Sequence, residues 1–297
     1  MPHTKTPLRY PGGKTQVSKF VAHTIQINHI LHPIYCEPFC GGAGVAIALL
    51  LSGNVERVIL NDYDSAIYSF WHAVLHDTER LMRAVYDTDI NLETWNEERR
   101  IYNELKDSPA YSFELAFATL FLNRTNRSGI ITGGPIGGLQ QNGAYLLDCR
   151  FNRENLVRKI QNIAERREQI DLYHLDAVDF IYDILMEQPY DQAFAFFDPP
   201  YYQQGKNLYK NCFDDEKHIL LSQAIQDMER FYWIATYDDS PRIHEIYQNM
   251  DMQYYELRYS ANQKRKEREL FFHSPVTQVE SYDKVCLERE IKLSLAV

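Results

Sequence analysis

The chain has 297 residues, of which 45% are hydrophobic and 24% are charged, and its formal net charge is −10. This length allows one or two domains with a substantial buried core, and the composition is that of an ordinary globular protein. The apolar runs, such as residues 44–51, are too short to span a bilayer, and the amino-terminal segment lacks the apolar stretch of a signal peptide. We therefore expect a protein that is neither inserted in a membrane nor secreted.

The five cysteines are scattered, and none belongs to a C-x-x-C pair. Structural zinc sites and disulfide frameworks need paired cysteines, so we expect a reduced, cytoplasmic protein without a metal. A net charge of −10 argues against a protein that coats nucleic acid nonspecifically, but an enzyme can bind DNA through a local basic surface. Basic residues are concentrated at residues 150–167 and 264–268, each of which is either such a surface or a solvated helix face.

Short apolar segments that end in small or acidic residues alternate with helical patterns along the chain. The pattern first predicts a strand at 34–39, followed by the glycine-rich residues 40–44 and a helix at 45–51. A strand at 57–60, which ends at Asn61-Asp62, and a helix through residue 75 come next. Further helices are predicted at 92–105, 113–121 and 153–166, and further strands at 170–175, 193–197 and 232–236. Such alternation is typical of a doubly wound, Rossmann-like α/β sheet, in which ligands bind at the carboxyl ends of the strands. Residues 81–169 interrupt it, and we expect them to form an inserted, mostly helical lobe between catalytic segments 1–80 and 170–297.

The segment Asp198-Pro199-Pro200-Tyr201 follows an aromatic-rich strand and carries the strongest chemical signal. An exocyclic amine of a base is a poor nucleophile, and an acidic side chain and a proline carbonyl can each accept one of its N–H bonds. Proline fixes the backbone that holds these acceptors. The tyrosine ring offers a stacking face for a base extruded from a duplex. This pattern favours methyl transfer to such an amine over a simple Pro-Pro turn.

The segment 37–44 is the second signal, since glycines between a strand and a helix allow a ligand close to the backbone. Asp62 ends the next strand, at the spacing of a carboxylate that binds ribose hydroxyls. Together these motifs predict an adenosyl cofactor. The sequence Gly13-Lys14-Thr15 imitates the end of a phosphate-binding loop, but that motif needs glycine where Leu8 stands, which excludes nucleotide hydrolysis.

Six separated motifs occur in the order found in the Dam-like (D12 class) adenine-N6 DNA methyltransferases, and the resemblance covers nearly the whole chain. They are residues 9–14, 37–44, 61–62, 123–125, 198–201 and 269–272. The resemblance implies a site-specific enzyme that transfers a methyl group from S-adenosylmethionine to adenine N6 in double-stranded DNA with base flipping. It also implies a restriction-modification context, in which a cognate nuclease is a further partner. Ala43 departs from the glycine that many family members have at this position.

The resemblance further assigns residues to roles. The implied cofactor contacts are Tyr10, Lys14, Glu37, Phe39, Gly41, Asp62, Asp176 and Asp198. The implied methyl-transfer residues are Asp198, Pro199, Pro200 and Tyr201. In the insertion, Arg124, Asn126, Arg127, Arg150 and Arg153 are the candidate DNA contacts, with Gln140 as a further candidate for reading adenine.

Three alternatives have different requirements. A cytosine-C5 methyltransferase needs a thiolate, typically in a Pro-Cys pair, and no cysteine follows proline here. Methyltransferases acting on RNA adenine or a protein amide commonly have Asn in place of Asp198 and lack a large insertion, so both features favour DNA. A non-catalytic DNA-binding regulator is expected to lose Asp198 or the glycine loop, and neither is lost.

Overall fold

A computed structural model describes residues 4–9, 14–202, 213–257 and 268–289 of the chain. Its strands are β1 (Ile34–Glu37), β2 (Arg57–Asn61), β3 (Ile170–Tyr173), β4 (Ala193–Phe197), β5 (Tyr232–Asp238), β6 (Gln253–Leu257), β7 (Arg268–His273) and β8 (Val285–Arg289). They form one sheet in the order β3-β2-β1-β4-β5-β7-β6-β8. The pairs β2–β3, β1–β4 and β4–β5 are parallel, which confirms the expected doubly wound α/β fold.

Burial on both faces explains why the parallel strands were predictable from sequence. All five residues of β4, Ala-Phe-Ala-Phe-Phe, are buried. A strand covered by helices on both faces has a continuous apolar run instead of an alternating pattern. The antiparallel strands β6, β7 and β8 complete the other edge and were not predicted.

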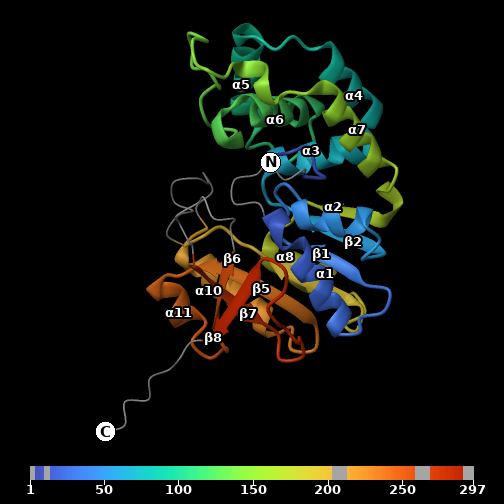
Figure 1. The fold of residues 1–297 in the computed structure, drawn as a ribbon, viewed down its shortest axis with the longest axis vertical. Helices are drawn as coiled ribbons and strands as arrows, with labels where there is room; N and C mark the ends of the chain where they lie inside the picture. Colours follow the sequence, from blue (N-terminus) through green and yellow to red (C-terminus); the bar gives the residue numbers. More distant parts are fainter. Residues whose placement is uncertain (1–3, 10–13, 203–212, 258–267, 290–297) are drawn as a thin grey trace. The chain divides into compact units, whose positions relative to one another are not determined.

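Chain contacts divide the protein into two compact units. Unit 1 comprises Met1–Thr15 and Cys40–Asp176, and unit 2 comprises Gln16–Phe39 and Ala177–Val297. The helices of unit 1 are α2 (Gly44–Leu51), α3 (Ser65–His76), α4 (Thr78–Asp87), α5 (Leu92–Leu105), α6 (Phe113–Thr125) and α7 (Arg153–Ala164). In Figure 1, α3, α5 and α6 lie side by side.

Helix α6 is the core of this helical region, because all but one of its residues are buried. It packs against α3 and α5, while α4 packs against α7. The helices expected for the insertion are therefore present, but they share a core with α3. The compact unit that holds them comprises Met1–Thr15 and Cys40–Asp176, and the expected lobe of residues 81–169 stays a prediction.

The helices of unit 2 are α1 (Ser18–Ile27), α8 (Ala177–Phe180), α10 (Asp215–Gln226) and α11 (Pro241–Ile246). Side-chain caps define two of their starts, since Asp214 accepts from the Lys217 N–H and Ser240 accepts from the Ile243 N–H. No helix within the described ranges is both long and apolar enough to cross a membrane.

Candidate active site

The glycine-rich loop of unit 1 is held by the end of β2 and by α3. The Cys40 N–H donates to the Asn61 carbonyl over 2.9 Å, and the Gly41 N–H donates to Asp62 Oδ2 over 2.8 Å. Trp71 Nε1 donates to the Gly41 carbonyl over 2.8 Å. Gly41 has φ of +46°, which glycine adopts without strain. The loop thus has a fixed path beside Asp62.

The first residue of α2, Gly44, packs closely on Thr15 of the Gly-Lys-Thr segment. A Cβ added at Gly44 would lie 2.1 Å from Thr15 Oγ1, so any other residue would force the Thr15 side chain to move. Lys14, in the same segment, is buried. Tyr10, also expected to contact the cofactor, lies outside the described residues. Thr15, which directly follows the motif at 9–14, thus packs against Gly44 of the motif at 37–44.

Asp62 is the carboxylate at the carboxyl end of β2. Its Oδ1 accepts the Asp64 N–H over 3.0 Å, in addition to the Gly41 contact at Oδ2. Burial, followed by the charge of Asp64, raises the Asp62 pKa to about 7 despite these hydrogen bonds. Asp64, and not Asp62, caps α3 through the N–H groups of Ala66 and Ile67. The Cys40 thiol also donates to Asp62 Oδ2, over 3.9 Å. Asp62 therefore lies at the end of β2, beside the glycine-rich loop, where the sequence predicts the ribose contact.

In unit 2, the carboxyl ends of β1 and β4 lie next to each other. The strand order reverses between them, which is where ligands bind in doubly wound sheets. Glu37 ends β1 and accepts from the Tyr35 hydroxyl over 3.0 Å, and both residues are buried. Burial and Glu37 raise the Tyr35 pKa well above its usual value, with a smaller contribution from Asp198. The structure thus brings Glu37 and Asp198 into one electrostatic environment.

Three side chains hold the segment that follows β4. Thr236 Oγ1 donates to Asp198 Oδ1 over 2.8 Å, and Tyr201 Oη donates to Glu269 Oε1 over 2.7 Å. Burial, followed by the charges of Asp198 and Glu269, raises the Tyr201 pKa well above its usual value. Asp198 and Tyr201 are half-buried and Pro199 is buried.

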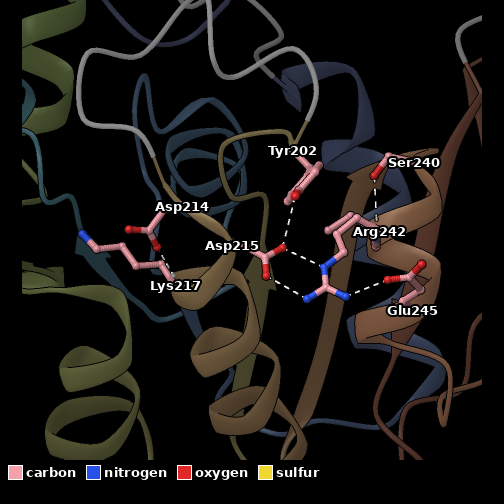
Figure 2. A network of polar contacts seen from close by, with 8 residues as sticks. Tyr202, Asp214, Asp215, Lys217, Ser240, Arg242 and Glu245 are labelled. Carbon is pink, nitrogen blue, oxygen red and sulfur yellow. Dashed lines mark hydrogen bonds and ion pairs between the residues drawn. The ribbon is translucent and has the colours of Figure 1, made fainter.

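The next residue, Tyr202, is held twice. Its N–H donates to Asp238 Oδ1 over 2.8 Å and its hydroxyl to Asp215 Oδ1 over 3.1 Å. Figure 2 shows Arg242 bridging Asp215 and Glu245. The paired guanidinium is the main reason that the Asp215 pKa falls to about 2.

The remaining candidates for cofactor contact are placed as follows. Phe39 packs edge-on to Phe213 with ring centroids 5.8 Å apart. Asp176 is half-buried between β3 and α8. Pro200 is half-buried beside Pro199.

A cluster of cations in unit 1 includes two of the candidate DNA contacts. Arg124 lies in the last turn of α6 and is buried. Among the residues that the structure describes, neither its Nε nor Nη1 of Arg9 has a hydrogen-bond acceptor. Burial, then the charges of Arg9 and Arg150, lowers the Arg124 pKa to about 10. Burial and then Arg124 likewise lower the Lys159 pKa to about 8. Within the described part of the chain, the charges that shift these two pKa values are all basic, so the cluster is suited to an anion.

Asn123 fixes Arg9 within this cluster. Its Oδ1 accepts the Arg9 N–H over 2.8 Å, and its Nδ2 donates to the carbonyls of Arg9 and Gly129 over 2.8 Å each. A Cβ at Gly129, whose φ is +79°, would lie 2.3 Å from the Arg9 carbonyl oxygen. Neither Arg9 nor Lys159 was among the candidate DNA contacts.

Two of the candidate DNA contacts have structural roles instead. Asn126 is fully buried, accepts from Trp95 Nε1 over 2.7 Å, and donates to the Ile130 and Ile131 carbonyls. Both amide protons and the carbonyl oxygen of its side chain are engaged, so a base-reading role for Asn126 is wrong. Arg153 donates to the Thr88 carbonyl over 2.7 Å, at the end of α4, and we reassign it to holding that helix. Arg127 and Gln140 are exposed and remain candidates.

Comparison with known proteins identifies the family. The profile of the D12 class N6 adenine-specific DNA methyltransferases matches residues 10–270. The chain belongs to this family of DNA-methylating enzymes, as its motifs predicted. A search of curated proteins gives no match. Two solved structures of the rRNA methyltransferase aviRa from Streptomyces viridochromogenes are similar, each with a TM-score of 0.37 and 10% identity; they cover 90% of this chain, and 87% and 88% of theirs.

Proposed function

We propose that the protein methylates adenine N6 within a specific sequence of double-stranded DNA, taking the methyl group from S-adenosylmethionine and acting on a base flipped out of the duplex. The family supplies the reaction class. The observation that carries the proposal is the placement of Asp198, next to Pro199 at the end of β4, with its Oδ1 held by Thr236.

The residues of unit 1 fit an adenosyl cofactor. Asp62 is half-buried at the end of β2, and its carboxylate can accept further hydrogen bonds from the two ribose hydroxyls. The glycine loop beside it exposes no large side chain at Gly41. S-adenosylmethionine, when bound, supplies a methyl group on a positively charged sulfur.

Asp198 and Pro199 supply the acceptors for the adenine amine. A carboxylate and a carbonyl that each accept one N–H increase electron density on N6 as it forms the new N–C bond. S-adenosylmethionine bound beside these residues would supply the methyl group and would depart as S-adenosylhomocysteine with the C–S electron pair. The proton that N6 gives up would pass to the Asp198 carboxylate, which already accepts that N–H. The ring of Tyr201 offers a face on which the flipped adenine stacks. Preorganised acceptors of this kind typically contribute a factor on the order of 10²–10³ in rate.

The cation cluster Arg9–Arg124–Arg150–Lys159 supports the DNA substrate. Among the described residues, Arg124 Nε and Arg9 Nη1 are buried without a hydrogen-bond acceptor, which is costly in the free protein, and a phosphate oxygen would supply one. This local positive charge reconciles DNA binding with a net charge of −10. Arg127 is exposed on the loop that follows α6 and is the candidate for reading base edges.

Methyl transfer from labelled S-adenosylmethionine tests the proposal. The protein is incubated with duplex DNA of mixed sequence, with structured RNA and with a protein extract in parallel, and the products are hydrolysed and separated. We expect label in N6-methyladenine from DNA alone. Label in RNA adenine or in a protein amide would move the enzyme to another substrate, and no label in any arm would favour the non-catalytic regulator.

A further inference from the structure

The antiparallel pair β5–β7 presents three polar side chains toward the segment that follows β4. Thr236 and Asp238 are two residues apart, so their side chains lie on the same face of β5. Asp238 is paired in register with Glu269 of β7. The three contacts reach Asp198, the Tyr202 N–H and the Tyr201 hydroxyl respectively. Strand register therefore determines where these three groups lie.

The hydroxyl of Thr236 has one proton, and it is donated to Asp198. Thr236 is 2% exposed, so water does not compete for this hydrogen bond. A charge-assisted hydrogen bond in a buried environment is among the stronger ones. It fixes one carboxylate oxygen and therefore the plane of the whole carboxylate, which sets the direction of the other oxygen.

The hydroxyl of Tyr201 is tied to Glu269 in the same manner. A tyrosine ring that is anchored at Cα and at Oη can no longer tilt freely about its side-chain bonds. A ring held in this way costs less entropy when a base stacks on it. The contact between Tyr201 and Glu269 therefore affects capture of the flipped base. The contact between Thr236 and Asp198 affects the carboxylate that accepts the amine N–H.

We propose that Thr236 and Glu269 are positioning residues of methyl transfer: Thr236 orients the Asp198 carboxylate toward the adenine amine, and Glu269 orients the Tyr201 ring on which that adenine stacks. The inference rests on the proposed function. Neither side chain touches the reacting atoms, and each acts through its partner in the segment 198–201.

The first test compares Thr236→Val with Thr236→Ser in single-turnover methylation of duplex DNA. Valine has the shape of threonine without the hydroxyl, and we expect it to slow transfer about 10- to 100-fold, with little change in S-adenosylhomocysteine affinity. Because Asp198 loses a donor to its charged form, the acid limb of the pH–rate profile should move to higher pH. Serine keeps the donor and should recover most of the lost rate.

The matched control is Thr119→Val. Thr119 is also fully buried and donates to a carbonyl, that of Leu115 within α6. This variant suffers the same chemical change and should keep the wild-type rate. Equal rates for Thr236→Val and wild type, or loss of rate without a shift of the pH profile, would overturn the role of Thr236.

The second test is a double-mutant cycle between Glu269→Leu and Tyr201→Phe. Glu269→Leu should lower the rate about tenfold, and it should have no further effect when Tyr201 has already lost its hydroxyl. Fluorescence of 2-aminopurine at the target position reports capture of the flipped base and should fall in both single variants. Tyr182→Phe is the control, because the Tyr182 hydroxyl also donates to a carboxylate, that of Asp227, over 2.7 Å.

Additive effects in the cycle, or unchanged fluorescence in Glu269→Leu, would overturn the role of Glu269. Different results would refute the positioning residues and the proposed function. If the wild-type enzyme and the variants were all fully active, the positioning role would be refuted and the proposed function would be unaffected. A wild-type protein without adenine methylation would remove both.

Discussion

Replacing Arg124 by methionine should stabilise the folded protein and weaken its binding to DNA. Arg124 is 8% exposed, and no described residue supplies a hydrogen-bond acceptor to its Nε. Burial, followed by the charges of Arg9 and Arg150, lowers its pKa from the ordinary arginine value to about 10. A cation whose pKa is depressed on folding destabilises the folded state at every pH below the lower pKa. At about 1.4 kcal/mol per unit, the cost here is about 3 kcal/mol.

Methionine retains the unbranched apolar stem and removes the charge. Loss of a cation from the last turn of α6 costs up to about 1 kcal/mol through the helix dipole. The net expectation is a free energy of unfolding about 2 kcal/mol higher than that of the wild type. Urea unfolding at pH 7 without DNA measures it. Arg127→Met is the control, because Arg127 is exposed and its loss should change stability by less than about 0.5 kcal/mol.

DNA affinity should change in the opposite direction. If Arg124 binds a phosphate, the slope of log affinity against log salt should fall by about 0.9 in Arg124→Met, and affinity should fall for all sequences alike. A variant that is less stable than the wild type would refute the reasoning about buried charge. A variant with unchanged affinity and unchanged slope would refute the phosphate contact.

Three further predictions concern other ionisable groups. Asp62→Ala should weaken S-adenosylhomocysteine binding about 10- to 150-fold in calorimetry. Asp64→Ala should instead lower the free energy of unfolding by about 1 kcal/mol, because it removes the cap of α3. Unchanged binding with lower stability in Asp62→Ala would make Asp62 structural. The Lys159 pKa is about 8, so DNA affinity should fall as pH rises through that value. Lys159→Met should abolish this pH dependence. An identical pH profile in the variant would exclude Lys159 as a DNA contact. Burial raises the pKa of Glu98, in α5, to about 7. The folded state therefore loses stability as pH rises from about 4.5 through 7, and Glu98→Gln should raise the free energy of unfolding by about 1–3 kcal/mol at pH 8 and by less at pH 5. Equal gains at both pH values would contradict this.

The parallel half of the fold was predictable because burial on both faces leaves an apolar run in the sequence. The segments 57–60 and 193–197 were predicted within one residue of β2 and β4, and the predicted helix 92–105 coincides with α5. The antiparallel edge gives a weaker signal. Strand β6, Gln-Tyr-Tyr-Glu-Leu, mixes polar and aromatic residues and owes its pairing to β7 and β8.

The site was predictable where one segment carries the chemistry and not where distant segments meet. The places of Asp62 and Asp198 at the carboxyl ends of strands were predictable because each follows an apolar segment, and their roles stay predictions. Thr236 and Glu269 reach Asp198 and Tyr201 across 38 and 68 residues of sequence, through strand register that the sequence does not display. Asn126 was misassigned for the same reason, since its partner Trp95 lies on another helix, α5.

Single-turnover transfer of labelled methyl groups to duplex DNA by Asp198→Ala tests the central claim most directly. Asp198 supplies an acceptor for the adenine amine in the proposed reaction, so its loss should lower the rate constant by a factor on the order of 10²–10³ or more. S-adenosylhomocysteine affinity, measured on the same preparation, should stay largely intact. A variant that forms N6-methyladenine at the wild-type rate would contradict the account.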